Sequence, residues 1–103
     1  MLNCVPLLPH IFAGTLTGKV YRSPNGDAAW VDITGSLTTN YIYDIGIKFG
    51  VVYLVCDQGI YRSIDNGDNW TKLNFDASAD APLSIAFHAN GDLFIGGNYG
   101  IYR

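Results

Sequence analysis

The residues with the clearest potential for chemistry lie in one short stretch, DNGDN at 65–69, where carboxylate and amide side chains follow one another. Oxygen-rich loops of this kind are typical of calcium sites. An EF-hand loop that began at Asp65 would need glycine at its sixth position and glutamate at its twelfth, where the chain has Trp70 and Asp76. The spacing therefore argues against calcium binding of the EF-hand type.

The other common metal ligands, histidine and cysteine, are few and dispersed. His10 and His88 have no second ligand at a suitable spacing, and we expect both to face solvent. Cys4 and Cys56 lie in separate apolar runs and form neither a CxxC motif nor a Cys/His group. We therefore predict no metal site, no cofactor, and two free thiols that pack as small hydrophobic residues.

Composition and charge exclude other classes of ligand. With 103 residues, 49% of them hydrophobic, the chain suffices for one globular domain with a modest core. The net charge is −3 and the six Lys and Arg residues are dispersed, which leaves no basic surface for nucleic acid. The apolar runs are far shorter than the ~20 residues that span a bilayer, and no signal peptide is visible. We expect a soluble chain without nucleic acid or membrane partners, and the sequence does not indicate its compartment.

A repeat of about 40 residues organises the chain. The segment KVYRSPNGDAAW at 19–30 matches GIYRSIDNGDNW at 59–70, and GIYR at 100–103 begins a third copy. The tyrosines of the repeat are 40 and 41 residues apart: Tyr21, Tyr61 and Tyr102. Apolar runs that end in small-residue turns precede each copy, as expected of strands joined by hairpins.

Each repeat predicts four short antiparallel strands and no helix. In the second repeat we place these strands at 42–49, 51–56, 59–64 and 70–75. Four such strands in about 40 residues are typical of one blade of a β-propeller. We therefore predict an all-β chain of about 2.5 to 3 blades within a single segment, 1–103. The blades are placed at 1–36, with 2–5 as the first strand, at 42–76 and, incomplete, at 82–103.

The stretch SIDNGDNW at 63–70 resembles the Asp-box, or BNR repeat, whose pattern is Ser/Thr-x-Asp-x-Gly-x-x-Trp. This motif occurs in the β-propellers of sialidases, sortilin-type receptors, some glucan-cleaving enzymes and photosystem assembly factors. The matching residues are Ser63, Asp65, Gly67 and Trp70, and the degenerate first copy has Ser23, Asn25 and Trp30 at the corresponding positions.

The resemblance implies that the box lies in the turn between the third and fourth strands of a blade, opposite the usual ligand site. Within such a turn, Asp65 can accept hydrogen bonds from backbone N–H groups, and Gly67 can adopt the left-handed conformation. Trp70 can pack its ring on the blade. We therefore expect the box to be structural.

The resemblance to sialidases also suggests an enzymatic alternative. That chemistry implies three arginines that converge on a carboxylate, together with a tyrosine nucleophile and an acidic partner. Arg22, Arg62 and Arg103 occupy one position of the repeat, so radial stacking of blades would spread them around the ring. No pair of carboxylates is placed for two-carboxylate glycoside hydrolysis. We therefore predict that the chain is not an enzyme.

Two sets of loops could carry a ligand, since functional groups of propellers gather around the mouth of the channel. The loops between second and third strands contain Asp57, Gln58, Asn98 and Tyr99. The links between blades contain Thr38, Thr39, Asn40, Ser78 and Asp80. Such polar and aromatic residues suit a glycan or a protein partner, and ordinary solvated turns are the alternative.

Fewer than four blades cannot close a propeller ring of the usual four to eight. The open strand edge and uncovered blade faces would invite pairing with other chains. We expect a homo-oligomer, most simply a dimer that closes a five- or six-bladed ring, or else a fragment of a longer propeller. The predicted function is a non-enzymatic binding or scaffold module with a glycan or protein ligand at the channel mouth. The alternatives are a purely structural assembly scaffold and an excised portion of a sialidase-like or other glycoside hydrolase.

Overall fold

A computed structural model of the chain describes residues 2–7, 10–24, 29–35, 37–73, 82–97 and 100–102, of which 2–7, 82–83 and 102 are described by their backbone alone. Strands are the regular secondary structure of these residues, as the sequence predicts. In this part of the chain, no helix is long and apolar enough to cross a membrane.

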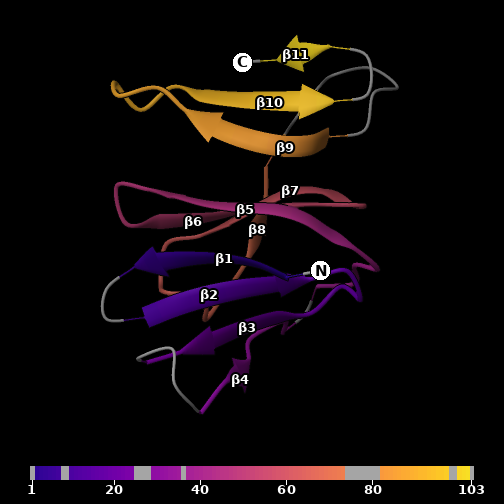
Figure 1. Ribbon diagram of the computed structural model, residues 1–103, viewed down its shortest axis with the longest axis vertical. Coiled ribbons are helices and arrows are strands. Elements are labelled where there is room, and N and C mark those ends of the chain that lie inside the picture. The colour runs from indigo at the N-terminus through magenta and orange to yellow at the C-terminus, as the bar shows by residue number, and fades with distance from the viewer. Residues whose placement is uncertain are drawn as a thin grey trace.

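The strands of the described residues form three antiparallel sheets (Figure 1). The first sheet contains β1 (Leu2–Leu7), β2 (His10–Thr15), β3 (Val20–Ser23) and β4 (Val31–Asp32). The second sheet contains β5 (Ile42–Lys48), β6 (Val51–Cys56), β7 (Gly59–Ser63) and β8 (Thr71–Lys72). The third sheet contains β9 (Pro82–Phe87), β10 (Leu93–Gly97) and β11 (Ile101–Tyr102). In each sheet, strands that are consecutive in the chain are neighbours.

The strands of the second sheet follow the predicted bounds closely. β6 has the predicted bounds, and β5 and β7 each end one residue earlier than predicted. β5 ends at Lys48 because Phe49 and Gly50 both have positive φ, 52° and 76°, and form a two-residue hairpin turn. The fourth strand, predicted at 70–75, is the shorter β8, and 74–75 lie outside the described residues.

The strands β1 and β9 are edge strands of their sheets, and each contains a proline. Pro6 and Pro82 have no N–H to donate, which an edge strand tolerates because one side of it pairs with no neighbour in its sheet. β1 extends two residues beyond the predicted 2–5.

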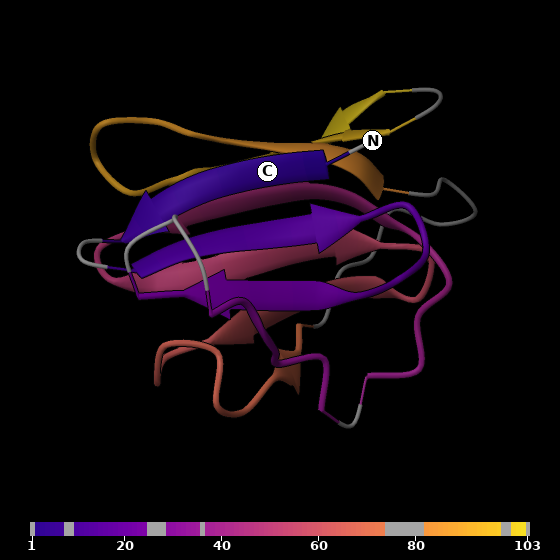
Figure 2. The same ribbon diagram turned by 60° about the horizontal axis from the view of Figure 1, so that its bottom comes forward.

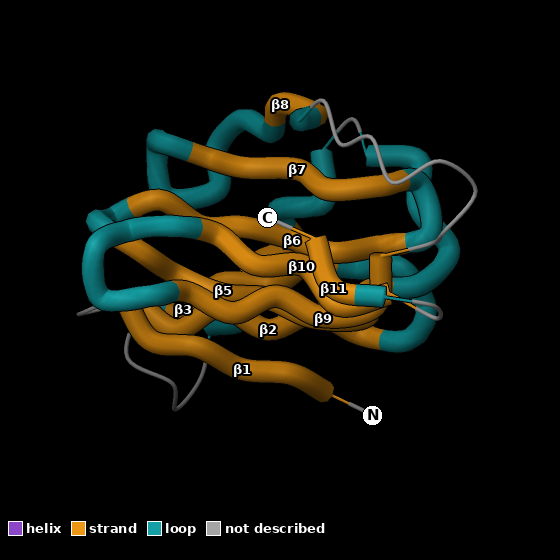
Figure 3. The backbone as a smooth tube through the Cα atoms, turned by 90° about the horizontal axis from the view of Figure 1, so that it is seen from above, coloured by secondary structure: helices purple, strands orange, loops and turns teal. Residues whose placement is uncertain are grey.

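The three sheets stack face to face, with the second sheet between the first and the third (Figure 1). The first strands of successive sheets lie side by side, since β1 contacts β5 and β5 contacts β9. Figure 3 looks down on this stack from the side of the third sheet and shows the sheets overlying one another. The second sheet is therefore covered on both faces. The described residues cover only one face of the first sheet and one face of the third.

Two apolar layers hold the stack together. The layer between the first and second sheets includes Phe12, Val20, Ile33, Ile42, Ile45, Val52, Leu54 and Cys56. The layer between the second and third sheets is built on Val55, Ile60 and Ile95. Because both faces of β6 are covered, its consecutive residues Leu54, Val55 and Cys56 are all buried. This double cover explains why the β6 sequence, VVYLVC, is apolar almost throughout.

Glycines allow the sheets to approach closely within each layer. A Cβ atom at Gly14 of β2 would lie 2.5 Å from Cγ2 of Ile42 and 3.1 Å from its Cβ. A Cβ atom at Gly46 of β5 would lie 2.7 Å from Cε2 of Phe87. A methyl group at either position would force its neighbours to move, so these positions suit glycine.

We expect Gly14→Ala to lower the free energy of unfolding by about 1–3 kcal/mol, because its methyl group would overlap Ile42. The free energy is measured by urea denaturation. Ile42→Ala removes the overlapping Cγ2 atom and completes a double-mutant cycle. Gly14→Ala should cost less in the Ile42→Ala background than alone. Equal costs in the two backgrounds would contradict the close approach of the first and second sheets.

Candidate functional site

Ser63 and Asp65 tie together the turn that follows β7. The Ser63 hydroxyl donates to the Asp65 carboxylate at 2.7 Å and accepts from the backbone N–H groups of Gly67 at 2.8 Å and Asp65 at 3.3 Å. The Asp65 carboxylate also accepts from the backbone N–H of Asn69 at 2.9 Å and from its side-chain amide at 2.8 Å. Asn66 and Gly67 both have positive φ, 60° and 89°, which closes the turn.

The Asp65 carboxylate is committed to its own turn. Hydrogen bonds from Asn69 and Ser63 lower the pKa of Asp65 from its ordinary value of 3.8 to about 2. The sequence suggested that this aspartate would satisfy the backbone N–H groups of the turn. In the structure it accepts the N–H of Asn69, while buried Ser63 accepts two others. A carboxylate held in this way stabilises the turn and is poorly suited to proton transfer at neutral pH.

The turn at residues 63–70, which we call the box turn, also packs against the first sheet. A Cβ atom at Gly67 would lie 2.5 Å from Cδ1 of Ile33 and 3.3 Å from Cε1 of Phe12. Trp70 donates a hydrogen bond from its indole Nε1 to the backbone carbonyl of Ile33 at 3.0 Å. The box therefore fastens the second sheet to the first.

The two described arginines of the repeat differ in their surroundings. Arg22 of β3 donates from Nη1 to the backbone carbonyl of Asn66 at 2.5 Å and to the Asp68 carboxylate at 3.1 Å. Arg62, at the same repeat position on β7, is exposed, and Arg103 lies outside the described residues. Arg22 thus strengthens the contact between the box turn and the first sheet.

The first copy of the box is only partly described. Ser23 is buried at the end of β3 and Trp30 is 41% exposed, whereas Asn25 lies outside the described residues. A different hydrogen-bonded turn lies at the end of β4. The Asp32 carboxylate accepts from the backbone N–H of Thr34 at 2.8 Å and from its hydroxyl at 2.5 Å. These bonds from Thr34 hold the pKa of Asp32 below its ordinary value.

Three loops gather at one end of the stack, which we call the loop end (Figure 2). They are the β2–β3 turn, the segment 37–41 between the first and second sheets, and the β6–β7 turn at 57–58. The β2–β3 turn packs directly on the linking segment, because a Cβ atom at Gly18 would overlap the backbone carbonyl of Thr39. This end contains the described members of the predicted ligand-binding loops.

Asp57 organises the loop end. Its carboxylate accepts hydrogen bonds from the Thr39 hydroxyl at 2.5 Å and the side-chain amide of Gln58 at 3.3 Å. It also accepts from the backbone N–H groups of Asn40 at 2.9 Å and Tyr41 at 3.2 Å. Burial alone would raise the pKa of Asp57, but these hydrogen bonds outweigh burial and lower it from 3.8 to about 2. Asp57 therefore positions the linking segment as an ionised acceptor.

The structure brings together some of the residues that the sequence predicts to bind a ligand. The predicted residues that meet at the loop end are Asp57, Gln58, Thr39 and Asn40, with exposed Thr38 next to them in the chain. The predicted residues that lie outside the described part are Asn98, Tyr99, Ser78 and Asp80.

Tyr41 belongs to the loop end and was missed by the sequence-based prediction. Its side chain is 49% exposed, and its ring stacks on that of Tyr43 with 6.1 Å between centroids. The backbone of Tyr41 is held from both sides, since its carbonyl also accepts the N–H of Asp57 at 3.2 Å. An aromatic residue directly after the polar link at 38–40 was the available signal.

The common metal ligands, histidine and cysteine, do not cluster in the described residues. Among the described residues, no group of three or more His, Cys, Asp or Glu could hold a metal ion. His88 is exposed as expected, whereas His10 is half-buried because its ring lies beside Phe12, 6.4 Å between centroids. Cys56 is a buried free thiol as predicted, and the side chain of Cys4 lies outside the described part.

No protein-family model and no curated protein matches this chain.

The box turn predicts a large difference between two glycine substitutions. Gly67 and Gly50 both have positive φ, 89° and 76°, but a Cβ atom at Gly50 would have nothing within 4 Å. Gly50→Ala should therefore cost only the conformational strain, about 1 kcal/mol. Gly67→Ala should cost a further ~1–3 kcal/mol because its methyl group would overlap Ile33. Urea denaturation of both variants measures the difference, and equal costs would contradict the fit of the box against the first sheet.

The low pKa values of Asp57 and Asp65 predict loss of stability in acid. Both values are about 2 in the folded chain against an ordinary 3.8, so each carboxylate contributes fully above about pH 4. That contribution is lost as the pH falls from about 4 towards 2. Asp57→Asn should reduce this pH dependence, and Asp57→Asn combined with Asp65→Asn should reduce it further. Urea denaturation at a series of pH values measures the free energy of unfolding. Variants whose free energy of unfolding falls with pH as steeply as that of the wild type would refute the prediction.

Proposed function

We propose that the chain is a non-enzymatic binding module built from β-propeller blades of the Asp-box type. Three antiparallel sheets with the same order of strands stack with their first strands side by side, which is how successive blades surround an axis. The box turn between β7 and β8 fastens neighbouring sheets, in keeping with the structural role that the resemblance implies.

Three of the described carboxylates support binding in preference to catalysis. The pKa values of Asp32, Asp57 and Asp65 are all lowered by hydrogen bonds, and those bonds come from residues of nearby turns. A general acid or base works best when its pKa lies near the working pH. Carboxylates tuned away from neutral pH suit fixed turns that present other side chains.

Exposed Tyr41 at the loop end is the observation that carries the proposal. Its ring is backed by Tyr43, and its backbone is fixed by Asp57, so it offers a rigid aromatic surface. The amides of Asn40 and Gln58 are exposed beside it and anchored on the Asp57 carboxylate. An apolar ring flanked by amides fits a sugar, whose ring stacks on the aromatic face while its hydroxyls bond to the amides. A glycan is therefore the proposed ligand.

A glycan array probed with the wild-type chain and two variants tests this function. Tyr41→Ala removes the proposed stacking surface and should weaken binding about tenfold. Phe49→Ala is the matched control, because Phe49 is another exposed aromatic residue, 76% accessible, at the opposite end of β5. Phe49→Ala should bind as the wild type does.

Absence of glycan binding by the wild-type chain would contradict the proposed glycan ligand. The remaining candidates would then be a protein ligand and a purely structural scaffold. Glycan binding that survives Tyr41→Ala would show that the loop end is not the binding surface.

A further inference from the structure

Each sheet of the repeat has two different faces, and the strand register identifies them. Ala13, Leu54 and Ile95 each pair with the tyrosine of their own repeat, so these three residues are equivalent. Gly14, the neighbour of Ala13, faces Ile42 of the second sheet. Because side chains alternate along a strand, Ala13 points away from the second sheet.

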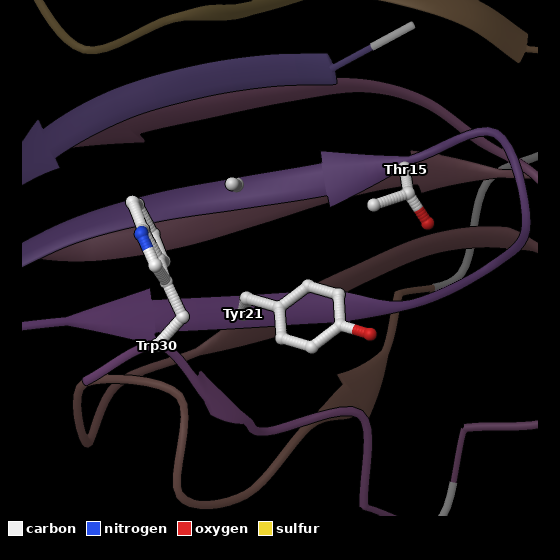
Figure 4. Close-up of a pocket in the computed structure, with 4 residues that line it drawn as sticks. Thr15, Tyr21 and Trp30 are labelled. Carbon is white, nitrogen blue, oxygen red and sulfur yellow. The ribbon is translucent and has the colours of Figure 1, made fainter. Parts of the chain in front are cut away.

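The outer side of the first sheet contains a hollow of about 270 Å³, lined by Ala13, Thr15, Tyr21 and Trp30. Figure 4 shows the side chains of Thr15, Tyr21 and Trp30 around it. Trp30 is 41% exposed, although tryptophan carries a large apolar surface. We call these four residues the first-sheet face.

The outer side of the third sheet contains a second hollow. The Phe87 ring packs towards Gly46 of the second sheet, so the alternate residues Ser84 and Ala86 point away from it. The hollow, of about 320 Å³, is lined by Ser84, Ala86, Phe94, Ile95, Gly96 and Ile101. The side chain of Ile95 is buried towards the second sheet, and we call the other five residues the third-sheet face. Ile101 is 80% exposed.

The contact between the first and second sheets is a template for joining these two faces. Phe12 and Val20 of the first sheet are fully buried against the second sheet. Their equivalents in the repeat, Phe94 and Ile101, belong to the third-sheet face. Phe12 and Val20 share their core layer with Leu54 of the second sheet, whose equivalent belongs to the first-sheet face. The third-sheet face is thus equivalent to the face of the first sheet that packs on the second sheet. The first-sheet face is equivalent to the face of the second sheet that packs on the first.

We propose that the third-sheet face of one copy binds the first-sheet face of a second copy, so that copies assemble head to tail. The ring of Phe94 enters the hollow beside Ala13, and the indole of Trp30 enters the hollow beside Gly96. Because two different faces meet, the interface is heterologous and generates a closed ring when its rotation closes. Two copies with three sheets each make six sheets, within the four to eight of propeller rings. This assembly does not depend on a glycan at the loop end.

Charged substitutions at exposed side chains test the two faces separately. Trp30→Glu places a carboxylate on the first-sheet face, and Ile101→Glu places one on the third-sheet face. Each should weaken association on the order of 100-fold or more, because the carboxylate would be buried against an apolar surface. Ile64→Glu is the matched control, since Ile64 is 76% exposed and lies in the box turn, away from both faces.

Light scattering across a dilution series measures the mass of each protein. The wild type and Ile64→Glu should form the same discrete multiple of 11.2 kDa, and the two face variants should be monomers. An equimolar mixture of the face variants should form a 1:1 dimer, because each retains the face that the other has lost. Dimer formation in the mixture also demonstrates that both variants are folded.

Four results would overturn the head-to-tail interface. They are a wild type that is monomeric at every concentration, a mixture of face variants that stays monomeric, and an Ile64→Glu variant that dissociates like the face variants. The fourth is a face variant that dimerises alone, which would indicate pairing between like faces.

Discussion

A sheet with apolar side chains on both faces needs a cover on each side, and the stack depends on this requirement. Within the described residues, only the second sheet meets it. Leu54 and Val55 are consecutive residues of β6 and are both fully buried, one in each layer. Gly14 and Gly46 bring the neighbouring sheets to contact distance. The apolar pattern and the glycines of this chain are thus two parts of one packing solution.

Where packed sheets end in turns, the backbone N–H groups of those turns need hydrogen-bond acceptors. Asp65, together with the Ser63 hydroxyl, provides them within a single turn. Asp57 provides them between two segments, because it joins the β6–β7 turn to the link from the first sheet. In both places the ionised carboxylate is the better acceptor, and the pKa falls to about 2. The low pKa of Asp57 and Asp65 therefore reflects hydrogen bonds that hold turns in place.

Much of the strand layout could be predicted from the sequence because the repeat aligns turn residues in successive copies. The errors in β5 and β7 are one residue each, and the first has a clear cause. Phe49 is a bulky residue with positive φ, which composition does not signal. The contact of Arg22 with the box turn was equally hidden, since it joins two different repeats. The exposure of Tyr41 depends on where Asp57 holds the linking segment, which is tertiary information.

Trp30 and Trp70 occupy the same position of the repeat and differ in what lies beside them. Trp70 has the first sheet as its neighbour, and its indole bonds to the backbone of Ile33. Trp30 lies on the outer face of the first sheet and is 41% exposed. The first copy of the box has lost the aspartate of the second, with Asn25 in its place, yet it retains the tryptophan. Trp70 packs its indole against a neighbouring sheet, and the proposed head-to-tail interface gives Trp30 the same role.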